Sequence, residues 1–276
     1  MPEFEYAIYN AFTRERFGGS PAALVRCHSE LSIETMQQIA REFNVPASGF
    51  ITGLNGDDIA IRFFSTQTEY PMCGHGSIAL ARWLAEIDLI KTSAKNRDIN
   101  LSTPTQTAKL LLENTADGIR VNMALKLAQF EQWAGRHEQL ETALGLGHGA
   151  IQQANPIGYT DADFRTLIVP LSHDSVICAM KPDFTIIRRY CMDQDIDTIM
   201  VFVGDMVNRE IKLHCREFCP AVGASEAPAS GTTQRALACY LHHFRVYEFP
   251  SSGSQYIHAT QGVEMGRPSE ILTQLA

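Results

Sequence analysis

The sequence predicts a mixed α and β protein, of the α+β class, built from two similar halves. Three features of its 276 residues support this prediction. Many short stretches alternate polar and apolar residues, which is typical of strands with one buried face. Fewer stretches place apolar residues three or four positions apart, as amphipathic helices do. One pattern of strand, turn and helix occurs twice, once in each half of the chain.

The first half is predicted to hold mostly strands, with two helices. Ser32–Phe43 has the apolar spacing of a helix, and Ser32 is a suitable N-cap. Gly74–Ile87 has the spacing of a second helix. Alternation predicts strands at Tyr6–Phe12, Ala22–Val25, Phe50–Thr52 and Ile59–Ser65, and a meander of antiparallel strands from Ile99 to Ala124.

The second half has the same mixture of elements. Helices are expected at His137–Leu146, Pro182–Met192 and Thr233–Phe244. Strands are expected at Thr166–Pro170, Val176–Met180, Thr198–Gly204, Ile211–Phe218 and Tyr256–Gly262. The least structured join lies around residues 130–136. We therefore expect an N-terminal half of residues 1–128 and a C-terminal half of residues 129–276, whose final segment is able to pack back on the N-terminal half.

The composition excludes several classes of protein. Hydrophobic residues make up 45% and charged residues 20%, which argues against a disordered or coiled-coil chain. The net charge of -8 does not favour a nucleic-acid partner. No apolar run reaches the ~18 residues that a membrane span needs. The N-terminus lacks the basic and apolar regions of an export signal. We expect a cytoplasmic protein with no nucleic-acid or membrane partner.

The seven cysteines do not indicate a disulfide framework, because their number is odd and they are widely scattered. The grouping of His214, Cys215 and Cys219 suggests a metal site, but the second ligand pair of such a site is missing from the sequence. We therefore expect reduced thiols and neither a metal nor a cofactor.

The repeated pattern begins at Cys73 in the first half and at Ser230 in the second. Counted from these residues, both copies have Gly at +1, Ala at +6, Leu at +7, Ala at +8, an aromatic residue at +10 and Leu at +11. An Arg-x-Phe strand precedes each copy. Unrelated amphipathic helices can share Ala and Leu positions. The shared glycine, the small nucleophilic residue before it and the upstream strand favour a true repeat.

Each copy predicts a helix whose first turn can hold an anion. The first N–H groups of a helix lack partners within the helix and carry a partial positive charge. Two such helix starts facing each other would suit a carboxylate. Cys73 would lie at one start, where its thiolate is stabilised, and Ser230 at the other. This arrangement favours moving a proton on or next to a carbon α to a carboxylate.

Further motifs extend over nearly the whole chain. In the first half they are Asn10–Thr13, Phe17–Val25, Ile39–Asn44, Arg62–Thr66 with Glu69, and Cys73–His75. In the second half they are Arg216–Phe218, Ser230–Thr232 and Gln261–Ser269. Together they resemble the phenazine-biosynthesis (PhzF-like) isomerase family, which is related in fold to diaminopimelate epimerase and proline racemase. The resemblance implies two pseudo-symmetric halves, each a curved, mostly antiparallel sheet or barrel around a central helix, with the site in the cleft between them.

The chain departs from the family pattern at three positions. Ala47 stands where the phenazine isomerases have their acid/base Glu, and Ala227 replaces the Asp of a Glu-Asp-Pro stretch. Ser20 replaces the Asn of a Gly-Asn-Pro turn. A methyl group cannot carry a proton, so the resemblance does not extend to catalysis through that Glu.

The motif residues that do match the family resemble its epimerase branch. Cys73 matches the first catalytic Cys of diaminopimelate epimerase, Ser230 lies where its second Cys lies, and His75 matches the family His that contacts substrate. These three residues are the expected catalytic set. Since a hydroxyl is a far weaker base than a thiol, Cys73 is expected to take the proton, and its return to rely on Ser230, water or the substrate. The expected substrate-binding residues are Gly74, Gly76, Gly231, Thr232 and Ser20.

Other polar residues are expected to be structural or solvated. Arg62, Arg216 and Arg267 are interpreted as structural, and Glu226 as an exposed loop acid. His242 and His243 are expected on a solvated helix surface.

The predicted function is that of a cofactor-independent isomerase or epimerase, of the racemase/epimerase type, acting on an amino or hydroxy acid derivative or another small carboxylate by proton transfer in the inter-domain cleft. Two alternatives stay open. One is a lyase or tautomerase using the same cleft, and the other is a non-catalytic carboxylate-binding member. A homodimer is compatible with the resemblance.

Overall fold

A computed structural model describes residues 3–91, 96–250 and 253–275. The chain forms two compact units. Unit 1 consists of the chain up to Ala11 together with Ser20–Leu125, and unit 2 of Phe12–Gly19 together with Lys126–Ala276. The loop at residues 12–19 therefore groups with the second unit.

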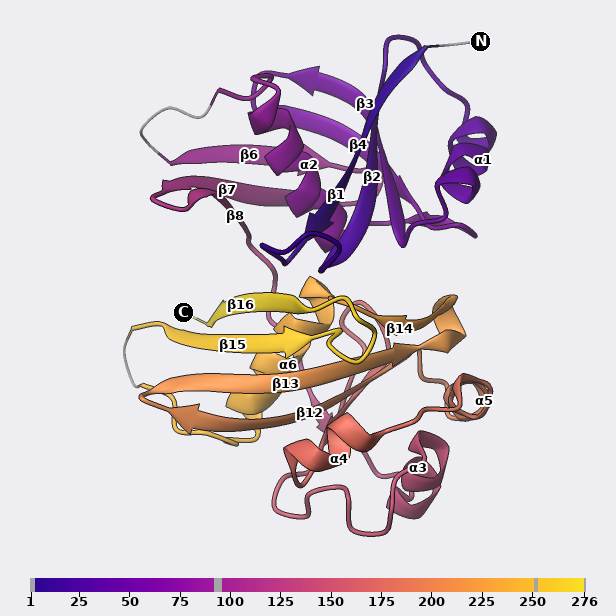
Figure 1. The fold of residues 1–276 in the computed structure, drawn as a ribbon, viewed down its shortest axis with the longest axis vertical. Coiled ribbons are helices and arrows are strands. Elements are labelled where there is room, and N and C mark those ends of the chain that lie inside the picture. Colours follow the sequence, from indigo (N-terminus) through magenta and orange to yellow (C-terminus); the bar gives the residue numbers. More distant parts are fainter. Residues whose placement is uncertain (1–2, 92–95, 251–252, 276) are drawn as a thin grey trace. The chain divides into compact units, whose positions relative to one another are not determined.

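The described residues of unit 1 form an eight-stranded sheet in the order β1-β2-β3-β4-β6-β7-β8, with β5 paired to β4 (Figure 1). Its strands are β1 (Phe4–Ala11), β2 (Ser20–Cys27), β3 (Ala47–Asn55), β4 (Asp58–Phe64), β5 (Glu69–Tyr70), β6 (Arg97–Ser102), β7 (Thr107–Thr115) and β8 (Gly118–Met123). The pairs β2–β3 and β4–β6 are parallel and the other pairs are antiparallel.

Helix α2 (Gly74–Glu86) is the central element of unit 1. Leu80, Ala81 and Leu84 are fully buried, and eight of its 13 residues are buried in all, as expected for a helix enclosed on several sides. The helix contacts both ends of the sheet, β1 and β2 on one side and β8 on the other, so the sheet curls around it. Helix α1 (Ile33–Phe43) buries only Met36 and Ala40 and covers a second apolar cluster.

The described residues of unit 2 form a second eight-stranded sheet, in the order β16-β15-β13-β12-β11-β10-β9, with β14 paired to β13. Its strands are β9 (Glu131–Gln132), β10 (Gly158–Thr160), β11 (Thr166–Pro170), β12 (Thr198–Val207), β13 (Glu210–Cys219), β14 (Ala224–Ala227), β15 (Gln255–Gln261) and β16 (Ser269–Leu275). Its helices are α3 (His137–Leu144), α4 (Asp174–Ala179), α5 (Phe184–Asp193), α6 (Gly231–His243) and the 3-10 turn η1 (Pro220–Val222).

The two faces of this second sheet bury different clusters. Leu213 and Cys215 of β13 face a core that contains α6. Phe218, on the opposite face, belongs to a cluster that includes residues of α3, α4 and α5. Since side chains alternate along a strand, β13 presents His214 and Arg216 to the α4 side and Glu217 to the α6 side.

The predicted repeat is present in the topology. In both units a hairpin (β3–β4 or β12–β13) is extended by a short antiparallel strand (β5 or β14) and followed by the buried helix. The next strand then pairs in parallel with the second strand of the hairpin, as β6 with β4 and β15 with β13. The mixed α+β architecture and the two similar halves are thus confirmed.

Three local predictions differ from the structure. Val176–Met180 was expected as a strand but lies largely in α4, because a short apolar run does not distinguish the two states. The helix from His137 ends at Leu144 rather than Leu146, since Gly145 takes a left-handed φ of 66°. The last strand, β16, and the short β5, β9, β10 and β14 were not predicted.

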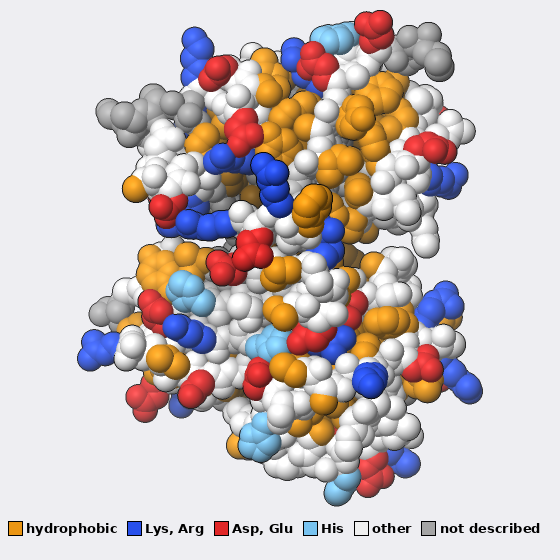
Figure 2. Space-filling model, viewed as in Figure 1, with side chains coloured by type: hydrophobic (Ala, Val, Ile, Leu, Met, Phe, Trp, Pro, Cys, Tyr) orange, Lys and Arg blue, Asp and Glu red, His pale blue; other side chains and the backbone are white. Residues whose placement is uncertain are grey.

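Acidic and basic side chains are interspersed over the face that Figure 2 shows. Within the described part of the chain, no helix has the length and apolar character that crossing a membrane requires.

Candidate functional site at two helix starts

The start of α2 brings five predicted site residues into one unit. Cys73 is the N-cap residue, in an extended conformation, and makes no capping hydrogen bond with its side chain. Its Sγ lies 3.5 Å from Nδ1 of His75. Ser20 is buried where β2 begins, next to Pro21, whose backbone contacts the His75 ring.

The two glycines of this turn have different surroundings. A Cβ added to Gly76 would lie 2.7 Å from the Phe63 ring and 3.2 Å from Sγ of Cys73, so this position requires glycine. A Cβ on Gly74 would meet only Sδ of Met123, at 4.0 Å. Gly74 therefore leaves room for a ligand at the start of the helix, whereas Gly76 lets the helix pack tightly.

Burial keeps both titratable groups of this turn neutral. It raises the pKa of Cys73 to about 12, although the backbone N–H groups of Gly76 and His75 favour the thiolate. Burial lowers the pKa of His75 to about 4, against the effect of the Pro21 backbone. Desolvation therefore acts on Cys73 in the direction opposite to the expected stabilisation of its thiolate by the helix start, and favours the neutral thiol.

The start of α6 is built from hydroxyl groups. Ser230 is the N-cap, and its Oγ accepts a hydrogen bond from the backbone N–H of Thr233 at 3.4 Å. The same Oγ lies 3.1 Å from the hydroxyl of Thr232 and 3.0 Å from that of Thr233. A Cβ on Gly231 would meet the ring of Phe12 at 3.4 Å, so the loop at residues 12–19 borders this turn.

Glu217 is a functional candidate that the sequence interpretation missed. Its carboxylate is buried on β13 and accepts a 2.6 Å hydrogen bond from the Thr233 hydroxyl and a 3.4 Å one from Gln261. Burial raises its pKa to about 7. Hydrogen bonds from Thr233, Gln261 and Ser230 stabilise the carboxylate and make this increase smaller. Its position in the sequence could have indicated this role. Side chains alternate along a strand, so Glu217 shares the core-facing side with Leu213 and Cys215.

Ala47 and Ala227 occupy the two positions where the resemblance implies an acidic residue. Ala47 is fully buried within the apolar cluster around α2. Ala227 is directly opposite Glu217 in the β13–β14 ladder, and its carbonyl accepts a hydrogen bond from Gln261. The acid nearest in register to the altered Asp position is therefore Glu217.

Glu226 is not the exposed loop acid that was expected. It lies on β14 with only 6% of its side chain exposed and forms a two-bond ion pair with Arg216, at 2.9 and 3.0 Å. The equivalent pair in unit 1 joins Arg62 to Glu69. Both arginines are thus structural, as predicted.

Several other polar residues lie in structural or surface positions. Arg267 donates hydrogen bonds to the carbonyls of Gly18 and Gly19, which confirms its structural role. His242 and His243 are exposed on α6, as expected. His214, Cys215 and Cys219 do not form a shared site, since Cys215 faces α6 and His214 the other side of the sheet. His214 instead lies with Asp174 and Cys178, whose ligand atoms are all within 4.8 Å of one another.

Comparison with known proteins supports the sequence resemblance. The chain matches the model of the PhzC-PhzF family, "Phenazine biosynthesis-like protein", over residues 9–276. It is 32% identical to trans-2,3-dihydro-3-hydroxyanthranilate isomerase of Pseudomonas aeruginosa, over 96% of this chain and 88% of that one. A crystal structure of a PhzF-family phenazine biosynthesis protein of Bacillus anthracis superposes with a TM-score of 0.86, at 23% identity, over 99% and 90% of the two chains.

A more distant structure has the same fold. A hydroxyproline epimerase of Agrobacterium vitis superposes with a TM-score of 0.56 at 10% identity, over 98% of this chain and 83% of the other. The architecture is thus shared by PhzF-family and epimerase structures. Since the family model covers almost the whole chain and curated relatives carry the name isomerase, the chain belongs to the phenazine biosynthesis-like family of isomerases.

Proposed function

We propose that this isomerase moves a proton on a small carboxylate-bearing substrate without a cofactor, using a relay of hydroxyl groups that ends at Glu217. The single observation that carries the proposal is the buried carboxylate of Glu217, linked through the Thr233 hydroxyl to Ser230. Its pKa of about 7 suits a group that both takes up and releases a proton near neutral pH.

The relay gives Ser230 a role that a serine alone cannot fill. A hydroxyl is too weak a base to hold a substrate proton, but it can pass one on while receiving its replacement. The proton would leave the substrate carbon for Ser230, and the Ser230 proton would move through Thr233 to the Glu217 carboxylate. Each hydroxyl ends with one proton, and Glu217 ends protonated, so the charges balance. In this chain Glu217 would thereby take over the acid/base function lost at Ala47.

The start of α2 would supply the other end of the reaction. The N–H groups of the first turn of α2 would bind the substrate carboxylate, with Gly74 leaving space for it. Cys73, neutral because it is buried, would deliver a proton to the substrate, and the thiolate would regain one from solvent. This direction of proton transfer is the reverse of the expected one, in which Cys73 takes the first proton.

The substrate class follows from the site and from one relative. The helix starts favour a carboxylate over a cation or a neutral molecule. The Pseudomonas aeruginosa relative is named for trans-2,3-dihydro-3-hydroxyanthranilate, which is a carboxylate. We propose a small amino- or hydroxy-substituted carboxylic acid for this chain as well.

The experiment is hydrogen exchange into carboxylic acids in D₂O, followed by NMR over a panel of amino, hydroxy and dihydroaromatic acids. We expect exchange at one carbon of a panel member, reduced about 10²- to 10⁴-fold in Cys73→Ala and in Glu217→Gln. The matched controls are Cys27→Ser and Glu210→Gln, which lie outside both helix starts.

The outcomes separate the alternatives. Exchange that both test variants retain at the wild-type rate refutes the relay. Elimination or tautomerisation of a panel member without return of the proton to carbon indicates the lyase or tautomerase alternative. Stabilisation by a carboxylic acid without any exchange indicates a non-catalytic binding protein.

A further inference from the structure

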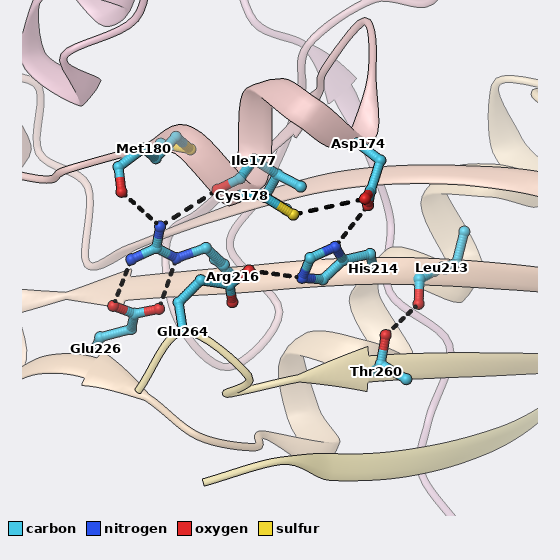
Figure 3. Close-up of polar contacts among 10 residues, drawn as sticks. All are labelled: Asp174, Ile177, Cys178, Met180, Leu213, His214, Arg216, Glu226, Thr260 and Glu264. Atoms are coloured by element: carbon cyan, nitrogen blue, oxygen red, sulfur yellow. Dashed lines mark hydrogen bonds and ion pairs between the residues drawn. The ribbon is translucent and has the colours of Figure 1, made fainter. Parts of the chain in front are cut away.

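A second cluster of reactive side chains lies on the opposite face of β13 from Glu217. Figure 3 shows His214 on β13 facing Asp174 and Cys178 on α4. Nδ1 of His214 is 2.7 Å from Oδ1 of Asp174, and Sγ of Cys178 is 3.5 Å from Oδ2 of the same carboxylate. All three residues belong to unit 2, and none contributes to either helix start.

Helix α4 is held over β13 by contacts that fix its position. The guanidinium of Arg216, two residues after His214 on the same face, donates to the carbonyls of Ile177 and Met180 at 3.4 and 3.1 Å (Figure 3). The remaining donors of Arg216 bind Glu226. Because Asp174 and Cys178 are four residues apart, they lie on one face of α4, and this clamp keeps that face over His214.

The other ring nitrogen of His214 has a carboxylate partner of its own. Nε2 lies 3.0 Å from Oε1 of Glu264, and both side chains are only 16% exposed. Histidines that bind metals usually donate their second N–H to a carboxylate, which orients the ring and makes the free nitrogen more basic. The 3.0 Å contact does not have hydrogen-bond geometry, so Glu264, on a segment separate from both α4 and β13, would take this orienting role after a small rotation of its carboxylate.

We propose that Asp174, Cys178 and His214 bind one divalent transition-metal ion of the zinc type, with Glu264 orienting the histidine. Imidazole, carboxylate and thiolate together are typical ligands of zinc. Asp174 and Glu264 also give the cluster a negative charge that a cation compensates, because the charge of Arg216 is already matched by Glu226.

The distances between the ligand atoms fit this ion after a small adjustment. Bonds of about 2.0 Å to nitrogen and oxygen and about 2.3 Å to sulfur place tetrahedral ligand atoms roughly 3.3–3.6 Å apart. The sulfur lies 3.5 Å from Oδ2 of Asp174, whereas Nδ1 of His214 contacts the other carboxylate oxygen, Oδ1, and all three ligand atoms lie within 4.8 Å of one another. The nitrogen-to-oxygen distance of 2.7 Å has to widen by roughly 0.6 Å, which the exposed Asp174 side chain permits by rotation.

Three protein ligands leave the fourth position to water. Asp174 and Cys178 are exposed, so the ion would be accessible from solvent. A bound divalent ion would favour the thiolate form of Cys178, so metal binding would release the thiol proton to solvent.

The test is titration of the full chain with Co²⁺, which reports thiolate ligation by a charge-transfer absorption, followed by displacement with Zn²⁺. We expect one equivalent to bind with that absorption. Cys178→Ser should abolish the absorption and weaken Zn²⁺ binding at least tenfold. Glu264→Gln should retain the absorption and weaken binding about 10- to 100-fold. Cys27→Ser, which changes another accessible thiol, should behave as the wild type.

Several results would overturn the proposal. They are the lack of stoichiometric Co²⁺ binding, binding without the thiolate absorption, or an absorption that Cys178→Ser retains and Cys27→Ser loses. Cys178 is exposed, so Cys178→Ser should fold normally, and a thermal unfolding curve verifies this. The readout does not involve turnover, so it stands or fails independently of the proton relay.

Discussion

The hydroxyl of Thr233 donates a 2.6 Å hydrogen bond to the buried carboxylate of Glu217. This contact joins the first turn of α6 to the strand that precedes it in the repeat. In unit 1 the position equivalent to Glu217 is held by Phe63, which packs against the backbone at Gly76. The two halves therefore share a fold, but at this equivalent position unit 2 has an acid beneath its helix start and unit 1 has an aromatic ring.

Glu217→Gln should change how stability depends on pH. The pKa of about 7 in the folded protein lies above the ordinary value of 4.5, so the folded state holds the proton more tightly. Its contribution to stability is fully present below pH 4.5 and is lost as the pH rises through 7. The loss amounts to roughly 3 kcal/mol. Relative to the wild type, Glu217→Gln should therefore gain stability between pH 5 and pH 8, measured by urea unfolding.

The control for this measurement is Glu210→Gln, at the exposed start of the same strand. Its stability relative to the wild type should not change between the two pH values by more than a few tenths of a kcal/mol, as for most surface substitutions. An equal difference between the wild type and Glu217→Gln at both pH values would show that Glu217 does not titrate in this range.

The thiol of Cys73 should react slowly with iodoacetamide in the free protein. Its pKa of about 12 leaves about one thiol in 10⁴ ionised at pH 8, and only the thiolate reacts. The side chain is also just 6% exposed. Peptide mass spectrometry should detect alkylation of the exposed Cys178 well before that of Cys73. Preferential alkylation of Cys73 would indicate a stabilised thiolate and a base at this position, contrary to the donor role proposed for it.

Much of the fold could be predicted from local patterns, because these report local physics. Ser32 caps α1 as expected, with its Oγ accepting from the backbone N–H of Thr35. The repeated Gly, Ala and Leu positions located both buried helices within three residues of their starts. Val176 and Ile177 were misassigned, because β-branched residues favour strands and the run is too short to show a helical period.

The predicted site was less complete for a different reason. Cys73 and Ser230 are recognisable because each directly precedes its helix, so sequence neighbours define the local geometry. Recognising Glu217 as a site residue requires knowing which face of the strand its side chain occupies. It also requires knowing that its carboxylate contacts a hydroxyl sixteen residues later in the chain. The protonation of Cys73 depends on how deeply the turn is buried, which the sequence does not display. Desolvation and long-range hydrogen bonds are properties of the packed structure.

Alanine at Gly76 and at Gly74 should have opposite consequences. At Gly76 the added Cβ would lie 2.7 Å from the fully buried Phe63 ring, and overpacking should cost roughly 1–3 kcal/mol of stability. At Gly74 the nearest atom is 4.0 Å away, and alanine favours helix, so stability should hold or rise slightly.

Carboxylate binding distinguishes the two variants further. Gly74→Ala fills the space proposed for the substrate carboxylate and should weaken binding of an active panel acid, measured by calorimetry, although the fold is intact. The wild type serves as the reference for both unfolding and binding. A Gly74→Ala protein that binds the acid with unchanged affinity would place the carboxylate elsewhere.

Arg267→Ala should loosen the loop at residues 12–19. The guanidinium donates 3.0 and 3.2 Å hydrogen bonds to the carbonyls of Gly19 and Gly18, and the backbone N–H of Gly19 donates to Pro268. Hydrogen bonds from a charged group are each worth roughly 1.5–3 kcal/mol, and local opening of the loop should become easier by a similar amount. Trypsin should then cut faster after the exposed Arg16 in Arg267→Ala than in the wild type.

The control for this prediction is Arg189→Ala, on the exposed face of α5, which should leave the rate of cleavage after Arg16 unchanged. Arg267→Lys should fall between the wild type and the alanine variant, because one ammonium group does not reproduce the two-point contact of the guanidinium. If Arg267→Ala is cut at the wild-type rate, the loop is held mainly by the backbone bond to Pro268, and Arg267 is not the residue that fixes it.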